Sequence, residues 1–384
     1  MHRKKIVVLG VTGSIGSSTL SIIRKYPDHF ELVGISYHEN IDLAISIQSE
    51  FKAKNICCTS VEQYAEHKYK WSSLGINIVS DVRDLLDCDY TLALNAVVGA
   101  AGLQTTFKVL SDGKILLLAN KESLVMGGEW LLKIAAKNGA RIMPVDSEHN
   151  SVYRLLANRS DYRKVILTAS GGAIRNFQLE AVPSLTPNQV LKHPVWNMGA
   201  KITVDSATMV NKALEIIEAH FLFDIPYEKL DAILHPESYV HAIVENMDTT
   251  TFYHVYKPDM IYSIAYCLFF PDSSPEILTN TTLLEMPILK FYSIDDKRYP
   301  AFKAGVDAGK AGGSYPLIFN AANEVGVRAF LDGKILFGDI SKLIAIALDS
   351  VKSNNRYSEN MEELMELDSI ARNFAAQTIN ERFI

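Results

Sequence analysis

The sequence has few cysteines and no long apolar run. Only four of its 384 residues are cysteine, and no two of them stand in a Cys-x-x-Cys spacing. This usage does not match a disulfide framework and fits a reducing compartment. No apolar run approaches the roughly 20 residues that a membrane-spanning helix needs. We therefore expect a cytoplasmic protein with no membrane partner.

The sequence also has no excess of positive charge. Its formal net charge is -6 at pH 7. Without a basic field, nucleic acid and anionic membranes are excluded as main partners. A small anionic substrate would then need local cations or a metal ion. A chain of this length exceeds what one core usually supports, so we expect two or three domains.

The first part of the chain, residues 1–145, alternates short apolar runs with amphipathic stretches. That rhythm is typical of an α/β fold, a Rossmann-like doubly wound parallel sheet with helices on both faces. The expected strands cover residues 5–10, 30–36, 53–58, 76–80, 90–97, 113–120 and 140–145.

The pattern of expected helices and strands changes twice in the rest of the chain. Residues 146–270 mix helices, one expected at 207–221, with long successive strands, which predicts a central α+β catalytic domain. Prolines punctuate residues 271–299, which we interpret as a linker. Residues 300–384 carry apolar positions at three- and four-residue spacing and predict a C-terminal α-helical bundle.

A glycine motif follows the first expected strand. Gly10, Gly13 and Gly16 lie between that strand and a helix, as in loops that bring a backbone close to a dinucleotide pyrophosphate. The alternative is a purely structural glycine turn. The second strand ends at His38-Glu39-Asn40, where an acidic residue favours the ribose 2'-hydroxyl of NAD.

A second polar motif, Asn120-Lys121-Glu122, follows a late strand of the same sheet. Ligands of doubly wound sheets lie outside the carboxyl ends of the strands, so these side chains should face the cofactor crevice. Lys121 could hold a phosphate or polarise a substrate oxygen. Alternatively, it is a surface lysine in a turn.

Two carboxylates, Asp146 and Glu148, follow the last expected strand of the sheet. In an extended backbone they would point the same way, and two like charges side by side favour a cation. Carboxylate ligands without cysteine favour Mg2+ or Mn2+, and a third ligand must come from elsewhere. The alternative is that Asp146 caps a helix starting near Ser147, with Glu148 in its first turn.

A third polar group lies on the helix expected at 207–221. Asn211, Lys212 and Glu215 share one helix face, which could present donors to a phosphate and an acceptor to a metal. The alternative is an ordinary surface Lys/Glu pair. Glu218 is an equally placed carboxylate that the spacing does not exclude.

These residues alone indicate an NAD(P)-linked, metal-assisted oxidoreductase of a small phosphorylated substrate. Two alternatives use the same features. One is a metal-dependent sugar-phosphate isomerase with a structural dinucleotide, and the other is a non-catalytic dinucleotide sensor that needs no carboxylate trio.

Together, the motifs resemble the 1-deoxy-D-xylulose-5-phosphate reductoisomerase family, and the resemblance runs nearly end to end. It implies NADPH- and metal-dependent conversion of 1-deoxy-D-xylulose 5-phosphate to 2-C-methyl-D-erythritol 4-phosphate in non-mevalonate isoprenoid synthesis. It also implies a homodimer. The motifs are GVTGSIG, VVGAAGL, LLLANKESLV, PVDSEHNS, ASGGAIR, HPVWNMGAKITVDSATMVNKALE, LHPESYVHAIVE and FNAANEV.

The resemblance also implies roles for single residues. The metal ligands would be Asp146, Glu148 and Glu215 rather than Glu218, with Lys121 joining these three as catalytic residues. Substrate contacts would come from Lys121, Ser147, Glu148, Ser170, His193, Trp196, Ser206, Asn211, Lys212 and Glu215. Cofactor contacts would come from Thr12, Gly13, Ser14, Ile15, Asn40, Asn120, Glu122 and Gly199. A mobile flap over the substrate would span residues 193–201, with Trp196 and Met198 as its lid.

One position departs from the family pattern. Where the family often has a lysine at the end of the second strand, this chain has Glu39. NADPH therefore follows from the resemblance, against the local charge.

Overall fold

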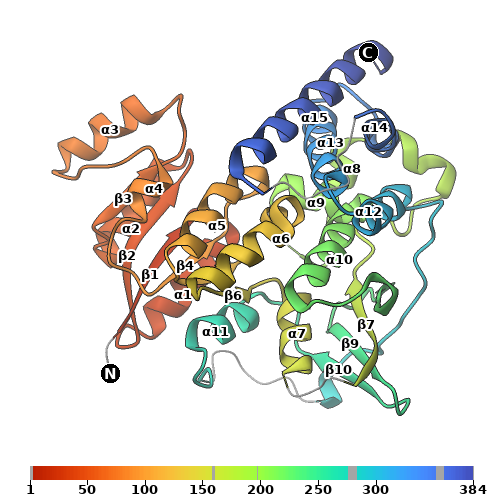
Figure 1. Ribbon diagram of the computed structural model, residues 1–384, viewed down its shortest axis with the longest axis horizontal. Coiled ribbons are helices and arrows are strands. Elements are labelled where there is room, and N and C mark those ends of the chain that lie inside the picture. The colour runs from red at the N-terminus through yellow and green to blue at the C-terminus, as the bar shows by residue number, and fades with distance from the viewer. Residues whose placement is uncertain (1–2, 158–160, 197, 276–282, 352–358, 384) are drawn as a thin grey trace. The chain divides into compact units, whose positions relative to one another are not determined.

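The computed structural model describes residues 3–157, 161–196, 198–275, 283–351 and 359–383 (Figure 1). The chain forms two compact units. The first unit comprises Met1–Ser123, Leu131–Asp146 and Asp259–Thr279, and the second comprises Leu124–Trp130, Ser147–Pro258 and Asn280–Ile384. Both units are discontinuous in sequence, and the division at residues 145, 270 and 299 stays a prediction. Asn197 of the expected flap and residues 276–282 of the expected linker lie outside the described residues.

The first unit contains the predicted parallel sheet. All neighbouring strands pair in parallel, in the order β3-β2-β1-β4-β5-β6. Their central residues are buried, as expected where helices cover both faces of a sheet. The strands are β1 (Lys4–Leu9), β2 (Phe30–Tyr37), β3 (Asn55–Cys58), β4 (Leu92–Asn95), β5 (Ile115–Leu118) and β6 (Arg141–Pro144).

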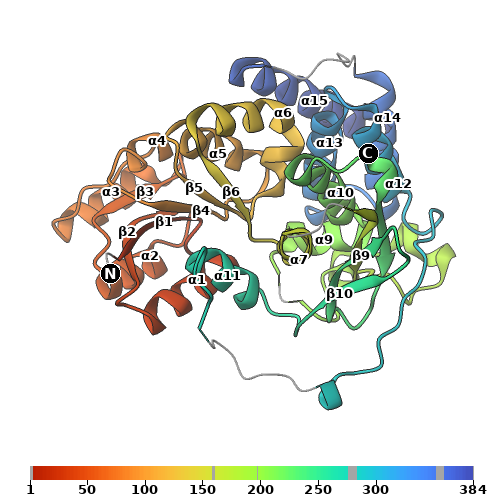
Figure 2. The ribbon, with the colours of Figure 1, turned by 60° about the horizontal axis from the view of Figure 1, so that its bottom comes forward.

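Helices connect these strands and cover the sheet. Figure 2 shows α1 and α11 on one face and α4 and α5 on the other. This arrangement confirms the doubly wound fold class. The helices are α1 (Ser14–Lys25), α2 (Ile41–Phe51), α3 (Tyr64–Ser73), α4 (Val82–Leu85), η1 (Gly99–Ala101), α5 (Gly102–Ser111), α6 (Lys121–Asn138) and α11 (Ile261–Phe269).

The prediction of a strand at residues 76–80 is wrong. Only an isolated bridge forms there, between Cys57 and Val79. The extended stretch ends because Asp81 accepts a hydrogen bond from the backbone N–H of Arg83 at 2.8 Å and starts the short helix α4.

The N-terminal strand is tied to a segment far along the chain. The Lys4 ammonium donates to the carbonyl oxygens of Leu268, Phe269 and Phe270 at 3.0, 3.0 and 2.8 Å. These carbonyls end α11, where a cation complements the helix dipole. The Phe269 ring also packs edge-on against Phe30 at 5.0 Å. Residues Asp259–Thr279 thus complete the first unit.

The second unit contains a four-stranded mixed sheet in the order β10-β9-β7-β8. β7 pairs in parallel with β8 and antiparallel with β9, which confirms an α+β arrangement. Helices α7 and α10 contribute Val152 and Ile216 to the same buried cluster as Val165 of β7. The elements are α7 (Ser147–Leu156), β7 (Tyr162–Ala169), η2 (Leu179–Ser184), α8 (Pro187–Val190), α9 (Ala200–Thr208), α10 (Val210–Phe223), η3 (Tyr227–Lys229), β8 (Leu230–Leu234), β9 (Val240–Asn246) and β10 (Thr251–Val255).

The single helix expected at 207–221 is wrong, because the chain breaks between α9 and α10 at Met209, which has φ 61°. The Thr208 hydroxyl donates to backbone carbonyls one turn back, at Val204 and Asp205, each at 3.2 Å. It also accepts from the N–H of Val210 at 3.3 Å. A side chain that bonds the local backbone in this way competes with the helical ladder. Asn211 therefore lies in the first turn of a new helix.

The C-terminal part of the second unit is helical, as predicted. Its helices are α12 (Pro300–Ala311), α13 (Tyr315–Leu331), α14 (Phe337–Ser350) and α15 (Met361–Arg382), after the short η4 (Leu283–Glu285) (Figure 1). Within the described residues, no helix combines the length and apolar character that crossing a bilayer requires.

Gly305 of α12 packs tightly between two helices. A Cβ atom there would lie 2.5 Å from the Phe319 ring of α13 and 2.6 Å from the Ala213 methyl of α10. We expect Gly305→Val to lower the free energy of unfolding by about 2 kcal/mol or more, because the added methyls overpack the contact. Urea denaturation measures this. Lys310→Val introduces the same residue at an exposed position of α12, and an equal loss in both variants would contradict the packing argument.

Candidate active site

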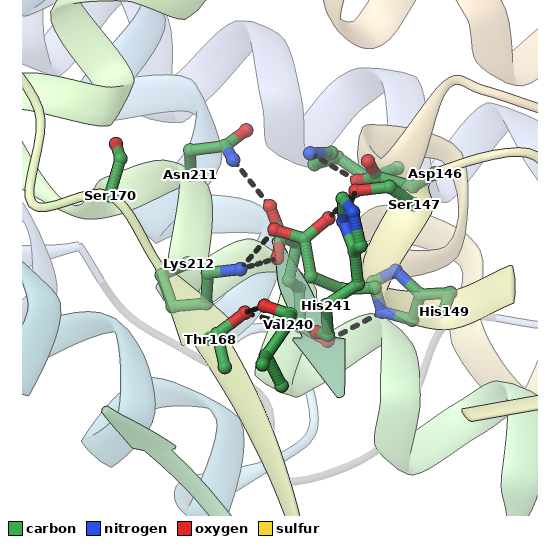
Figure 3. Close-up of polar contacts among 12 residues, drawn as sticks. Asp146, Ser147, His149, Thr168, Ser170, Asn211, Lys212, Val240 and His241 are labelled. Carbon is green, nitrogen blue, oxygen red and sulfur yellow. Dashed lines mark hydrogen bonds and ion pairs between the residues drawn. The ribbon is translucent and has the colours of Figure 1, made fainter. Parts of the chain in front are cut away.

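Two carboxylates of the second unit face each other across one ammonium group. Glu148 lies in the first turn of α7, and Glu215 lies on α10. Lys212 Nζ is 2.6 Å from Glu148 Oε1 and also donates to Glu215 (Figure 3). The two carboxylates each offer an oxygen within 4.8 Å of the other. The site therefore holds a cation between two anionic groups.

The ammonium and one of the two carboxylates are shielded from water, whereas the Glu148 side chain is 17% exposed. The Lys212 and Glu215 side chains are 3% and 1% exposed. Burial alone lowers the pKa of Lys212, but Glu148 and Glu215 raise it, and the net shift is upward. Lys212 thus stays an ammonium at neutral pH. The alternative of an ordinary surface Lys/Glu pair is wrong.

The expected helix face is confirmed within α10. The Asn211 amide donates to Glu215, four residues on, so Asn211, Lys212 and Glu215 act on one side of the helix. Because the amide and the ammonium both donate to Glu215, its oxygens are oriented before any ligand arrives.

The extended backbone that the sequence predicted through Asp146 and Glu148 is wrong. The backbone is not extended through Asp146 and Glu148, since α7 begins at Ser147. Within the first unit, Asp146 Oδ2 lies 2.7 Å from Lys121 Nζ, and the Lys121 side chain is 13% exposed. Lys121 is therefore not an open surface lysine. It begins α6 and is paired with Asp146.

Glu218 has a different partner from Glu215. His149 Nε2 donates to the backbone carbonyl oxygen of Glu215 at 2.9 Å, and its Nδ1 lies 3.6 Å from Glu218 Oε2. Both side chains are buried. The spacing could not separate these two glutamates. In the structure their contacts differ, because Lys212 contacts Glu215 and His149 contacts Glu218, and the choice of Glu215 as metal ligand stays a prediction.

Ser147 is oriented by a residue that the sequence analysis missed. Its hydroxyl donates to Glu148, and its oxygen lies 3.0 Å from His241 Nδ1, while His241 Nε2 donates to the Tyr256 carbonyl oxygen at 3.3 Å. The His241 ring stacks on Tyr256 at 3.8 Å, and burial lowers its pKa to about 4. A neutral His241 therefore fixes the serine. The available signal was its place within the motif LHPESYVHAIVE.

Ser170 and His193 form a second polar group in the same unit. His193 Nδ1 accepts from the backbone N–H groups of Val195 and Trp196 at 3.1 and 2.8 Å, so the ring proton is on Nε2. Nε2 then donates to Ser170 Oγ at 3.0 Å. Burial lowers the pKa of His193 to about 4, which keeps this tautomer neutral. Ser170 can thus donate its own proton to an anion.

The loop that carries Ser170 lies against helix α9. Gly172 has φ +62°, and a Cβ atom there would be 2.6 Å from the carbonyl oxygen of Ser206. Only glycine allows this approach. The Arg175 guanidinium, which the sequence analysis did not single out, donates to the Ser170 carbonyl at 2.6 Å. Hydroxyl donors and a positive charge are thereby gathered around one loop.

Three residues of the expected flap, Trp196, Met198 and Gly199, follow His193 along the chain. Trp196 is half-buried, and its ring lies edge-on to His241 with centroids 6.5 Å apart. Met198 is half-buried and Gly199 is exposed at the start of α9. A lid movement stays a prediction.

The glycine loop of the first unit fits a dinucleotide. Gly10 has φ +78°, and a Cβ atom there would be 2.7 Å from the Ala96 carbonyl oxygen. A Cβ atom on Gly16 would likewise clash with the Val11 carbonyl oxygen. Helix α1 begins at Ser14, so backbone N–H groups near Gly13, Ser14 and Ile15 lie at a helix N-terminus, as a pyrophosphate requires. Thr12 is half-buried in the same loop.

Asn120 and Glu122 form hydrogen bonds that hold the loops at the ends of the neighbouring strands. Asn120 Oδ1 accepts from the N–H of Ser123 at 3.0 Å and caps α6. Its amide donates to the carbonyls of Val97 and Gly99 and to Glu122 at 2.7, 2.8 and 3.0 Å. The structure thus shows Asn120 and Glu122 organising these loops, and direct cofactor contacts by them stay predictions.

Family models match most of the chain. Residues 6–128 match the description "1-deoxy-D-xylulose 5-phosphate reductoisomerase", and residues 142–223 match its C-terminal domain. Residues 256–374 match "DXP reductoisomerase C-terminal domain".

Curated relatives carry the same name along their whole length. The 1-deoxy-D-xylulose 5-phosphate reductoisomerase of Leptospira interrogans serovar copenhageni is 41% identical, covering 96% of this chain and 95% of its own. That of a Geobacillus species is 40% identical, covering 97% and 98%.

Solved structures of high similarity exist as well. A reductoisomerase crystallised with NADPH, fosmidomycin and magnesium superposes with a TM-score of 0.93 at 33% identity, covering 98% of both chains. The Zymomonas mobilis enzyme in complex with NADPH gives 0.90 at 32% identity, covering 99% of this chain and 100% of its own.

The Lys212 ammonium should hold the two carboxylates together. We expect Lys212→Met to lower the free energy of unfolding in EDTA by about 3–5 kcal/mol, because it leaves the buried carboxylate of Glu215 and the partly buried one of Glu148 without their cation. Urea denaturation measures the loss. Lys303→Met removes the exposed ammonium that pairs with Asp307 and should change little. Equal losses would show that burial gives Lys212 no special role.

Proposed function

The chain belongs to the 1-deoxy-D-xylulose 5-phosphate reductoisomerase family, and from this we propose its reaction. It rearranges the carbon skeleton of 1-deoxy-D-xylulose 5-phosphate and reduces the resulting aldehyde with NADPH to 2-C-methyl-D-erythritol 4-phosphate. This is a step of non-mevalonate isoprenoid precursor synthesis, and it uses Mg2+ or Mn2+.

The observation that carries the metal proposal is the ammonium between Glu148 and Glu215. The Lys212 ammonium occupies the position between the carboxylates that a metal ion would take. Hard carboxylate oxygens suit Mg2+ or Mn2+. We propose Asp146 as the third ligand, since its Cα can lie at most about 7 Å from that of Glu148, two residues on. A divalent ion would displace the ammonium and free Lys212 for the substrate.

The phosphate of the substrate would bind at the Ser170 loop. Ser170 and Ser206 supply hydroxyls, and His193 supports Ser170 through Nε2. Asn211 and Lys212 add an amide and an ammonium from the first turn of α10. Binding energy from this remote group can close the flap, with Trp196 and Met198 over the reacting carbons.

The remaining side chains would handle protons near the reacting carbons. When bound, the metal supplies Lewis acidity and NADPH supplies a hydride. The ammonium of Lys121 can donate a hydrogen bond to a developing alkoxide. Glu148, held by Ser147 and His241, can accept and return a hydroxyl proton.

The cofactor would bind along the glycine loop of the first unit. We propose contacts from Thr12, Gly13, Ser14 and Ile15 to the pyrophosphate, and from Asn40, Asn120, Glu122 and Gly199 elsewhere. We also propose a cytoplasmic homodimer with separate NADPH-binding, catalytic and C-terminal helical domains.

An absorbance assay at the NADPH band tests the reaction directly. With 1-deoxy-D-xylulose 5-phosphate and Mg2+, we expect NADPH oxidation equal to product formed, abolished by EDTA. Product formation without NADPH oxidation would instead favour a sugar-phosphate isomerase. NADPH binding without any metal-dependent turnover would favour a dinucleotide sensor.

Two neighbouring glutamates test the ligand assignment. We expect Glu215→Gln to raise the Mg2+ concentration for half-maximal activity by about 10–100-fold, because it removes a charged ligand. Glu218→Gln, one turn along α10, should leave that concentration nearly unchanged. The assignment is wrong if the two variants respond alike in a Mg2+ titration.

A further inference from the structure

Glu39 lies at the carboxyl edge of the parallel sheet, just after strand β2. β2 ends at Tyr37 and α2 begins at Ile41, so Glu39 lies in the short connection between them. β2 pairs with β1, which leads into the glycine loop. The Gly10 N–H donates to Ser36 Oγ at 3.1 Å, and the Val11 N–H donates to the Ser36 carbonyl at 2.9 Å. The end of β2 is therefore bonded to the phosphate-binding turn.

The connection is held in place by its backbone. The Ile41 N–H donates to the Glu39 carbonyl at 2.8 Å, and Asn40 Oδ1 caps α2 by accepting from the Leu43 N–H at 3.1 Å. The Thr59 N–H donates to the Tyr37 carbonyl at 2.9 Å. Glu39 is thus an exposed carboxylate on an anchored turn.

A carboxylate at this point has a known chemical consequence. In dinucleotide folds, the acidic residue after the second strand accepts a hydrogen bond from the ribose 2'-hydroxyl of NAD. A 2'-phosphate at the same place carries negative charge and would be repelled by the carboxylate, whereas a basic residue would attract it.

The neighbouring segments offer little positive charge against this repulsion. Residues 10–16, 37–40 and 58–63 contain no lysine or arginine. Lys70 of α3 approaches the start of α2, but its ammonium lies 2.6 Å from Asp42 and is neutralised there. His38 Nδ1 is hydrogen-bonded to Thr59 Oγ1 at 3.1 Å.

We propose that Glu39 relaxes cofactor selectivity in this chain, so that NADH binds and donates hydride alongside NADPH. The proposal rests on the proposed function for its reaction. The two dinucleotides should bind with dissociation constants within about tenfold of each other, less than about 1.4 kcal/mol apart.

Calorimetric titration of the full-length protein with NADH and with NADPH tests the proposal without turnover. Glu39→Lys should raise the ratio of the NADH to the NADPH dissociation constant by at least about tenfold, because a cation replaces an anion beside the 2'-position. Glu39→Gln should raise it by a smaller factor. Asp28→Lys makes the same charge change at the opposite end of β2 and should leave the ratio unchanged.

A wild-type preference for NADPH above about tenfold would overturn the proposal. So would a ratio that Glu39→Lys does not alter, or alters no more than Asp28→Lys. These outcomes are separate from the reaction itself. If both dinucleotides bind similarly but neither is oxidised with 1-deoxy-D-xylulose 5-phosphate, the proposed function fails while the role of Glu39 in binding stands.

Discussion

The candidate site depends on one buried interaction, the contact of the Lys212 ammonium with the carboxylates of Glu148 and Glu215. Without a cation, two helices would bring like charges together in a region shielded from water, which is strongly unfavourable. The ammonium offsets the repulsion between the carboxylates, and its hydrogen bonds also orient them. A divalent ion would thus enter a site whose geometry is already set, and the lysine it displaces would still lie beside the substrate.

Each of the two compact units contains its own set of the polar groups described above. The glycine loop, the Asn120 network and the Lys121–Asp146 pair belong to the first unit. The hydroxyl donors of the Ser170 loop and the Glu148–Glu215 pair belong to the second. Asp146 and Ser147 are consecutive residues, so a single peptide bond links the residue that carries a carboxylate of the first unit to helix α7 of the second.

The sequence predicted best where a pattern is local. Continuous apolar runs predicted all six strands of the parallel sheet, together with one at residues 76–80 that does not form, and three- and four-residue spacing predicted the C-terminal helices. It failed where a single side chain redirects the backbone, as Asp81 does at α4 and Thr208 does before Met209. Spacing placed Asn211, Lys212 and Glu215 on one face, but it could not show that His149 engages Glu218 instead, because that contact joins separate helices. The same limit hid His241, whose role depends on Ser147 far away in the chain.

The hydrogen bonds from Lys4 to the end of α11 have a consequence for biosynthesis. The first strand leaves the ribosome early, but the carbonyls that bind its lysine are made only after much of the second unit. At about 5–20 residues per second, the N-terminal sheet waits roughly ten seconds for its last helix. Until then, the apolar surface that Phe269 covers around Phe30 is open. The nascent chain therefore offers chaperones a binding surface that the finished protein no longer has.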